Sequence, residues 1–452
     1  HPLSHTLIDE TKEASTHRPD SPLLPALPPR GRVVRGMSHS GAGACPARPA
    51  RSWYFLVVET QKGPSMRYRG SIFSQLLKPI SRRWFAGVVE RHDGDAYDKS
   101  FRSWEHLISL IYAQLSGAAS LRTIESVWNA NAHHHYHLGA GPISRSTLSD
   151  ANSRRPVAIF AETFAMLSAH ADRTLRREGT EMVRLIDSSP IPLGEVIGER
   201  AWNGRIKGMK LHVVYDADAD RPTRIDITPA NVNDIEIGRD VAIAPGTTFV
   251  FDKGYCSYVW WSRLHAAGAL FVTRRKDNAR FRSIRKRSLA KTKGEGFTVL
   301  EDCEVKLASK GDSKLAFPIR RIRVRRQKGG IITLLTNDMQ RSAVVIAALY
   351  KARWQIELLF RWIKQHLNLA TFLGRSDNAI RLQIIAAMIA YLLLRLAARE
   401  SWSKMPAIRF ADLVATCLFV RKPLARLDKP PDVNASAAPP RTSPNQMELC
   451  YV

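Results

Sequence analysis

The N-terminal half of the chain places apolar residues at helical spacing. In Phe101–Ser116 the apolar side chains recur at intervals of three and four residues, which predicts one long helix. Two shorter helices are predicted at Leu121–Ala130 and Thr147–Arg155, on either side of a connector containing histidine and glycine. We therefore expect the segment from Met66 to about Thr174 to be helical.

From about Met182 the pattern changes to the alternation and short apolar runs of β-strands. Met209–Tyr215 and Thr223–Thr228 alternate around a turn-rich stretch, which predicts a β-hairpin. Three further strands are predicted at Met182–Ile186, Thr247–Phe251 and Leu270–Thr273. A helix is predicted at Tyr258–Ala267, between the last two of them. This order predicts a mixed α/β domain in which Asp187 and Asp252 end two of the strands.

The C-terminal part begins with a basic, strand-like stretch. We interpret residues 278–336 as a β-rich insertion rather than a continuation of the sheet. A long helix, Arg341–Leu367, and a second apolar helix, Asn378–Arg399, follow it.

These patterns divide the chain into five parts. Residues 1–65, rich in Pro, Ser, Arg and Gly, are expected to be a disordered or non-native leader, with the natural start near Met66. The other parts are a helical N-terminal domain at 66–175, a core formed by 176–277 with 337–422, the insertion at 278–336, and a Pro-rich tail at 423–452.

Composition adds a strong charge to this picture. The 452 residues contain 68 Lys and Arg against 41 Asp and Glu, a formal charge of +27, with 44% hydrophobic residues. A chain with this balance can bury a core and favours a polyanionic partner, nucleic acid first. The five cysteines form no C-x-x-C pair, which suits a reducing compartment. The longest apolar run, Ile384–Leu394, is too short to cross a bilayer, so we expect no membrane partner.

One face of the helix Leu349–Leu367 carries the first candidate chemistry. At about 100° per residue, Tyr350, Arg353, Glu357, Arg361 and Lys364 fall on one narrow stripe. Glu357 could be only the ion-pair partner of its neighbours. However, three cations for one carboxylate leave a surplus that favours a second anion such as phosphate.

Asp187 and Asp252 complete an acidic set. Two strand-end aspartates and one helical glutamate can hold two divalent ions, and oxygen ligands suit Mg²⁺ or Mn²⁺. Such a pair of ions supports phosphodiester transfer. A rival cluster, Asp216, Asp218 and Asp220, lies in the predicted hairpin turn, and we interpret it as solvated turn residues.

Several other polar groups have a functional and a structural interpretation. Arg145, Arg154 and Arg155 make the second short helix a candidate DNA-reading element, or else a solvated basic face. Basic residues of the insertion either contact DNA or protect an edge strand; they are Arg320, Arg321, Arg323, Arg325, Arg326 and Lys328. The cluster His133–His135 with His137 has no nearby acid or cysteine, so ring packing is favoured over zinc.

The stripe is part of a wider resemblance. The spacing Tyr350-x-x-Arg353-x-x-x-Glu357-x-x-x-x-x-x-Lys364 is similar to the Y-R-E-K signature of hairpin-forming DDE transposases of bacterial insertion sequences. Ile186–Ser189 (IDSS) and Phe251–Tyr255 (FDKGY) resemble the two aspartate motifs of that family. The segment from Ser71 through the SRSTLSDANSRRP stretch resembles the N-terminal domain of one branch, and Gln446–Leu449 resembles the usual family ending.

The resemblance, which spans about Met66 to Leu427, implies a fold and an activity. The fold would be a ribonuclease-H-like core with a β-rich insertion before the glutamate, behind a helical DNA-binding domain. Asp187, Asp252 and Glu357 would be catalytic and hold two Mg²⁺ or Mn²⁺ ions. Tyr350, Arg353 and Lys364 would contact the phosphates and bases of the element's end.

The implied reaction is cut-and-paste transposition. Such enzymes hydrolyse each end, form and reopen a hairpin, and join the 3′-OH to target DNA. The implied partners are the terminal inverted repeats, the target duplex and a second copy of the chain, in a bacterial cytoplasm at the nucleoid. One feature departs from the family: the insertion contains Phe281, Phe297 and Phe317 but no tryptophan, which relatives use in base flipping.

Two alternatives share parts of this pattern. An inactive relative that occupies inverted repeats would keep the basic surface without the chemistry. A metal-dependent nuclease would keep the acids without strand transfer.

Overall fold

The computed structural model describes residues 70–96, 98–175, 181–193, 208–307, 315–367, 372–400 and 407–427. The leader at 1–65, the tail beyond Leu427 and the Gln446–Leu449 motif lie outside the described residues.

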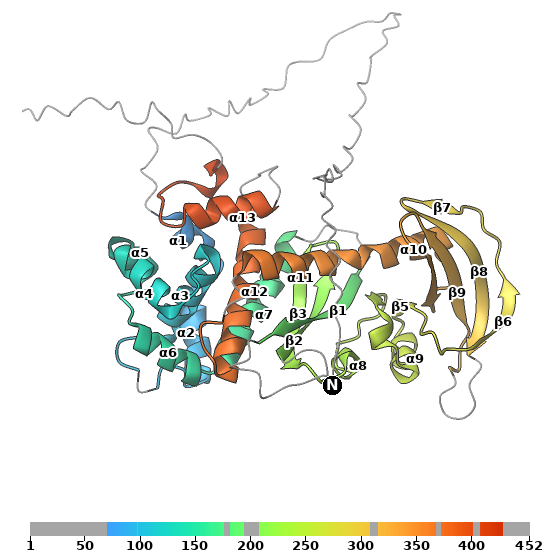
Figure 1. Ribbon diagram of the computed structural model, residues 1–452, viewed down its shortest axis with the longest axis horizontal. Helices are drawn as coiled ribbons and strands as arrows, with labels where there is room; N and C mark the ends of the chain where they lie inside the picture. The colour runs from blue at the N-terminus through green and yellow to red at the C-terminus, as the bar shows by residue number, and fades with distance from the viewer. Residues whose placement is uncertain are drawn as a thin grey trace, which may run out of the picture. The chain divides into compact units, whose positions relative to one another are not determined.

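The predicted helical segment forms a set of helices (Figure 1). They are α1 (Ile72–Leu76), α2 (Arg82–Arg91), α3 (Ser103–Ser116), α4 (Leu121–Ala130), α5 (His135–Leu138), α6 (Arg145–Arg154) and α7 (Val157–Leu175). Serine caps begin several of them: the hydroxyl oxygens of Ser120 and Ser144 accept the backbone N–H groups of Thr123 and Thr147 at the starts of α4 and α6. The three helices predicted here are confirmed, with ends that differ by at most two residues.

The strands that follow form one end of a large mixed sheet. They are β1 (Val183–Pro192), β2 (Gly208–Asp216), β3 (Arg221–Pro229), β4 (Thr248–Phe251) and β5 (Leu270–Arg274). β1 pairs with β4 and β4 with β5 in parallel, whereas β2 pairs antiparallel with both β1 and β3. The hairpin predicted from alternation is confirmed as β2–β3.

The basic stretch after β5 continues this sheet, so its interpretation as a separate β-rich insertion is wrong in one respect. Its strands are β6 (Phe281–Lys286), β7 (Lys293–Gly294), β8 (Phe297–Leu307), β9 (Ile319–Arg326) and β10 (Ile331–Thr336). The strand order is β3-β2-β1-β4-β5-β10-β9-β8-β6, with β7 against β8. β10 bonds to the free edge of β5, with Leu334 opposite Arg274. An unpaired β5 edge would leave backbone donors and acceptors exposed.

Helices cover both faces of the sheet. α8 (Asp234–Arg239), a 3-10 turn at Lys253–Tyr255 and α9 (Tyr258–Ala266) lie along the chain between β3 and β5. Buried residues of α9, including Trp260 and Trp261, pack with Phe249, Phe251 and Phe271 of β4 and β5. Val250 and Val272 belong to the other core, which is shared with α3, α7 and the last helices.

The predicted long helix is divided in two. α10 (Ala343–Ala352) and α11 (Trp354–His366) follow one another in nearly one line across the sheet (Figure 1). They meet at Arg353, whose backbone stays in the right-handed helical region at φ −52° and ψ −28°. Its N–H bonds to the carbonyl of Tyr350, three residues back, so the turn is tighter than in an α-helix.

The last apolar helix is a core helix. α12 (Asp377–Glu400) packs against α3, α6, α7 and β3. It is, among the described residues, the one helix long and apolar enough to cross a membrane, yet 89% of that window is buried inside the fold. α13 (Ala407–Thr416) and a 3-10 turn at Leu424–Arg426 follow. Leu424 and Leu427 are buried. The first residues of the Pro-rich tail predicted at 423–452 therefore pack onto the fold.

Arg155 is a structural residue in this fold, which corrects its assignment as a DNA contact. Its side chain is about 2% exposed and donates to Asp95 Oδ1 and Asp98 Oδ2, both at 2.7 Å. It also donates to Ser103 Oγ and the carbonyl of Phe101, each at 2.8 Å. The guanidinium therefore connects the end of α6 to the start of α3 through hydrogen bonds, and it is not available to a phosphate.

This arrangement predicts different effects for two adjacent arginines. Arg155→Met should lower the free energy of unfolding by about 3–5 kcal/mol, because it removes a buried guanidinium and leaves two partly buried carboxylates without their cation. The side chain of Arg154 is 68% exposed and lies 3.9 Å from Asp98, so Arg154→Met should change stability by less than about 0.5 kcal/mol. Thermal and urea denaturation of both variants would measure this; equal stability of the two would contradict the assignment.

Candidate active site

Parallel pairing brings the two candidate aspartates together. The last paired residues of β1 and β4 are Ile186 and Phe251, which are direct neighbours in the register. Asp187 and Asp252 come next, one on each strand. The prediction that Asp187 ends a strand is wrong, because β1 runs on to Pro192 while it pairs with β2. Asp187 nevertheless lies where β4 stops, so its side chain is next to the end of that strand.

The helix pair α10–α11 brings the third acid to the same place. Arg353 Nη1 donates to Asp187 Oδ2 at 2.7 Å, and Nη2 of the same guanidinium donates to Glu357 Oε1 at 2.5 Å. The hydroxyl of Tyr350 donates to Asp252 Oδ1 at 3.0 Å. One short stretch of helix thus contacts all three acids, which lie 65 and 105 residues apart along the chain.

Burial and like charges control the electrostatics here. Burial, helped by the nearby carboxylates of Glu357 and Asp252, raises the pKa of Asp187 to about 6 against the opposing effect of Arg353. For Arg353, burial acts to lower the pKa, but Asp187, Tyr350 and Glu357 raise it overall. Burial, with the nearby Asp252 carboxylate, also raises the pKa of the Tyr350 phenol. The site therefore holds a permanent cation among mutually repelling acids.

The two remaining residues of the predicted stripe, Lys364 and Arg361, have different surroundings. Lys364 Nζ donates to Ser189 Oγ at 2.8 Å and to the carbonyl of Pro190 at 2.9 Å, which places it along β1 beyond Asp187. Arg361 is exposed, and its guanidinium lies over the ring of Trp354, 5.7 Å from the centroid. The prediction of a single five-residue face is therefore correct for four residues, while Arg361 lies to the side.

The acids supply oxygen donors for a hard cation but do not form a ready ligand group. Among the described residues, no three His, Cys, Asp or Glu side chains gather as they would around a metal ion. Arg353 and Tyr350 lie on the carboxylate oxygens instead. The donor chemistry fits Mg²⁺ or Mn²⁺, provided that these two side chains give up their partners.

A cavity of about 440 Å³, lined by residues of β8, β9 and β10, has one of the three acids, Asp252, in its wall. Phe297, Val324 and Ile332 give it an apolar wall, and Trp354, which is 50% exposed, stands at its edge. Cationic side chains also line it, namely Arg274, Arg326, Lys328, Lys351 and Arg353. A flat, apolar group attached to a phosphate would match this lining.

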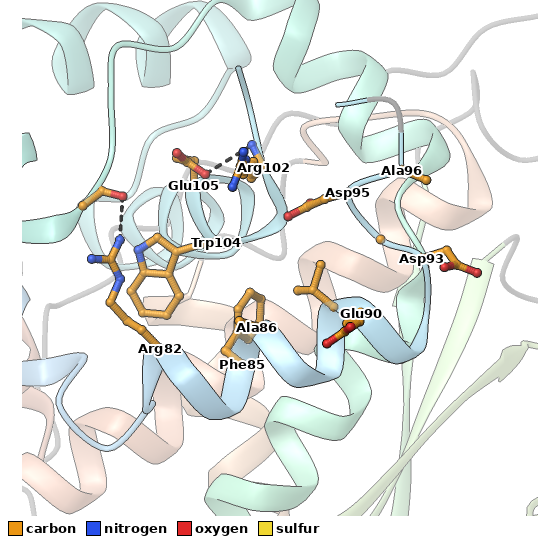
Figure 2. Close-up of a pocket in the computed structure, with 13 residues that line it drawn as sticks. Arg82, Phe85, Ala86, Glu90, Asp93, Asp95, Ala96, Arg102, Trp104 and Glu105 are labelled. Carbon is orange, nitrogen blue, oxygen red and sulfur yellow. Dashed lines mark hydrogen bonds between the residues drawn. The ribbon is translucent and has the colours of Figure 1, made fainter. Parts of the chain in front are cut away.

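A second cavity, of about 570 Å³, lies among the N-terminal helices (Figure 2). Phe85, Ala86 and Trp104 form its apolar side, and four charged residues, Arg82, Arg102, Glu90 and Asp93, also line it (Figure 2). Its lining contains none of the three candidate acids, so it is no part of the candidate active site.

The histidine cluster and the hairpin aspartate Asp216 have structural contacts. His135 stacks on Trp128 and His134 on Phe419, which confirms ring packing for the histidine cluster. Asp216 is fully buried and ion-paired with Arg184, so the interpretation of the hairpin acids as solvated is wrong for this residue.

Some basic residues of the segment 278–336 are held inside the fold, and others are exposed. Arg320 is buried and donates to both oxygens of Asp302, at 2.6 and 3.2 Å, so it cannot contact DNA. Arg321 and Arg323 both pair with Glu301. Arg325, Arg326 and Lys328 are exposed and remain candidates for DNA contact.

Sequence reasoning missed a polar group behind Asp187. Asp234, the first residue of α8, accepts hydrogen bonds from Ser188 Oγ at 2.8 Å and Lys210 Nζ at 3.0 Å. No periodic pattern marks Asp234, because its partners come from two strands that precede it in the chain.

Comparisons with known proteins identify the family of the segment that carries these acids. Residues 178–393 match the family described as Transposase DDE domain, a range that contains all three acids. Residues 69–141 match a family described as Domain of unknown function (DUF4372).

Relatives give the same family. Putative transposase y4zB of Sinorhizobium fredii is 59% identical over 305 residues, which is 68% of this chain and 86% of the relative. A probable transposase for insertion sequence element IS5377 of Geobacillus stearothermophilus is 30% identical, over 55% of this chain and 66% of the relative. A piggyBac transposase synaptic complex with hairpin DNA covers 84% of this chain and 88% of its own, at 9% identity and a TM-score of 0.40, too distant to carry an argument.

Proposed function

The chain belongs to the DDE transposases of insertion sequences, and from this premise we propose that it catalyses cut-and-paste transposition with Asp187, Asp252 and Glu357 as its catalytic acids. The observation that carries the proposal is their convergence: parallel register brings Asp187 next to Asp252, and Arg353 ties Asp187 to Glu357. Acids from three distant segments do not gather in a partly buried place without a compensating reason, since their charges repel.

The same three side chains would hold two Mg²⁺ or Mn²⁺ ions. Bound there, such ions activate a water or a 3′-hydroxyl and stabilise the leaving oxygen of a phosphodiester. The structural requirement falls on this chain: Arg353 and Tyr350 must release the oxygens of Asp187, Glu357 and Asp252 that they contact now.

We infer that a DNA phosphate provides this release. Arg353 presents a planar fork of donors, and a phosphate accepts such a fork as a carboxylate pair does. When the element's end enters, the guanidinium exchanges carboxylate oxygens for phosphate oxygens, and Tyr350 turns with it. This reconciles the two interpretations of the stripe, since the ion pair with Glu357 belongs to the free protein and the phosphate contact to the DNA complex.

The remaining assignments follow from position. Arg361 and Lys364 would extend the phosphate contact along α11, and Arg154 would contact DNA from the N-terminal helices, for which residues 66–175 serve as the DNA-binding domain. The core of 176–277 with 337–422 would be ribonuclease-H-like, and the mixed order β3-β2-β1-β4-β5 supports this. The inverted repeats and target duplex are the substrates, and a second copy would hold the second end, in the cytoplasm without a membrane partner.

Trp354 supports a hairpin step despite the absence of tryptophan from residues 278–336. It is half exposed beside the 440 Å³ cavity, and that cavity also contains Asp252, Tyr350 and Arg353. A base turned out of the duplex could stack on this indole while its phosphate meets the cations.

Removing the helical carboxylate should separate chemistry from binding. Glu357→Gln should reduce cleavage of a donor carrying the inverted repeats by at least about 100-fold in Mg²⁺, because one oxygen ligand is lost. Binding to the ends, measured by gel shift, should stay within a few-fold of wild type. Wild-type nicking by this variant would sink the catalytic assignment, and product without metal would favour another chemistry. Cleaved ends that are never joined would indicate a nuclease.

The partner exchange of Arg353 predicts two measurable changes. Without DNA, Arg353→Gln should bind Mn²⁺ more tightly than wild type, because the competing cation is gone. With DNA, it should bind the ends more weakly and with a salt slope smaller by about 1. Arg361→Gln is the control for the metal measurement, since Arg361 touches none of the acids. Equal Mn²⁺ affinity in Arg353→Gln and wild type would refute the exchange.

Trp354→Ala should affect the hairpin more than the first nick. Loss of one stacked base costs about 1–3 kcal/mol, so hairpin formation should fall roughly 5- to 150-fold while initial hydrolysis changes little. Denaturing gels of end-labelled donor separate the two products. Trp354→Phe should restore much of the hairpin. An equal loss of both products would remove the stacking role.

A further inference from the structure

We propose that Asp234 is a positioning residue that sets the separation of Asp187 and Asp252. This inference rests on the proposed function, in which those two aspartates act together. Asp234 itself contacts neither of them in any hydrogen bond or ion pair described above. Its contacts reach Ser188, the residue after Asp187, and Gly254, the second residue after Asp252.

The first connection leads to Asp187 through β1. Successive side chains of a strand point to opposite faces, so Ser188 faces away from Asp187 and towards α8. Ser188 Oγ donates to Asp234 Oδ1 at 2.8 Å, while the backbone N–H of Ser188 donates to Asp187 Oδ1 at 2.9 Å. One residue thus links both carboxylates, by its hydroxyl on one side and its backbone on the other.

The second connection leads to Asp252 through the turn after β4. Asp252 caps the 3-10 turn Lys253–Tyr255, and its carbonyl accepts the N–H of Tyr255 at 3.1 Å. Oδ2 of Asp234 lies so close to Gly254 that a Cβ there would be 3.1 Å from it. The ring of Tyr255 likewise rests on Gly238 of α8, where a Cβ would be only 2.9 Å from the ring. The turn carrying Asp252 is therefore seated on the helix that Asp234 begins.

Lys210 fixes the carboxylate between these two connections. Its Nζ donates to Asp234 Oδ1 at 3.0 Å and to the carbonyl of Val232 at 2.8 Å. Lys210 belongs to β2 and lies opposite Pro190 of β1 in the ladder. The ion pair is about three-quarters buried or more on both sides, so the carboxylate is held in one orientation, with Oδ1 towards β1 and Oδ2 towards the turn.

In this proposal, Asp234 affects the distance between Asp187 and Asp252 and not the reactivity of either carboxylate. Two carboxylates that share cations must keep a fixed separation, and the covalent frame between Asp187 and Asp252 is long. β1 and β4 hold them through backbone pairs that stop one residue earlier, at Ile186 and Phe251. Beyond that pair, Asp234 supplies the next link between the two segments.

The test measures the acid pair without relying on cleavage alone. Asp234→Asn keeps the size of the side chain but removes the charge that orders Lys210 and Ser188. With a DNA end bound, we expect Mn²⁺ affinity, measured by electron paramagnetic resonance, to fall about 10- to 100-fold, as for other outer-shell partners of metal ligands. End binding should change little, and so should the melting temperature, because the amide oxygen of Asn and the Val232 carbonyl still accept hydrogen bonds from Lys210. Cleavage should be lost at low Mn²⁺ and recovered in part at high Mn²⁺.

Four further variants make the outcome unambiguous. Ser188→Ala should act in the same direction, and the double variant with Asp234→Asn should lose less than the sum, because both remove one link. Asp226→Asn is the matched control, since Asp226 of β3 pairs with Arg224 instead. Glu357→Gln, run in parallel, reports on the proposed function itself.

The possible results separate the two ideas. If Glu357→Gln is inactive while Asp234→Asn binds Mn²⁺ like wild type, the positioning role is excluded and the proposed function stands. If Glu357→Gln cleaves normally, the proposed function fails, and the Mn²⁺ measurement still decides whether Asp234 orders the aspartates. A loss in Asp234→Asn that Asp226→Asn shares, or that matches a fall in melting temperature, would make Asp234 a residue of general stability only.

Discussion

The bridge that Arg353 makes between Asp187 and Glu357 is the interaction on which the site depends. The three acids lie at the end of a parallel strand pair and under a helix, where burial makes their charges costly and mutual repulsion adds to that cost. A guanidinium placed between two of them offsets both terms. The same contact fixes α11 over β1, because Arg353 stands at the joint where α10 ends and α11 begins. The helix pair, the sheet and the acids are thus coupled through one side chain.

The exposed charge of the chain is smaller than its composition suggests. Of 68 lysines and arginines, several of those in the most basic-looking segments are used inside the fold. Arg155 closes α3 onto α6, Arg320 lies flat against Asp302, and Arg221 pairs with Asp172 and Asp216. A run of arginines in β9 therefore divides by strand alternation, with one face buried and the other open to a polyanion. Net charge indicates the kind of partner, while the sheet decides which cations can reach it.

The sequence predicts local structure and the chemical identity of the site better than it predicts which residues oppose each other. Helical spacing located α3, α4 and the stripe on α10–α11, and alternation located the β2–β3 hairpin, because these signals lie within a few residues. The acids could be chosen because two follow apolar runs and one stands among cations. By contrast, the pairing of β10 with β5, the burial of Arg155 and Arg320, and the network around Asp234 depend on partners tens of residues away. The spacing of residues within one helix or strand does not indicate these distant partners.

The proposed partner exchange of Arg353 also implies an order of events. In the proposed exchange, the acids stay paired with Arg353 until another anion draws that arginine away, and the anion proposed is a phosphate of the DNA backbone. On that proposal, the acids would bind metal ions after the element's end is engaged rather than before it. For an enzyme that cuts DNA this order has a direct benefit, since free protein carrying assembled metal ions could hydrolyse any duplex it met. Arg353 alone would give specificity for phosphate without sequence. On the same proposal, the N-terminal helices and the exposed arginines of β9 would supply the remaining discrimination by fixing where along the duplex that phosphate lies.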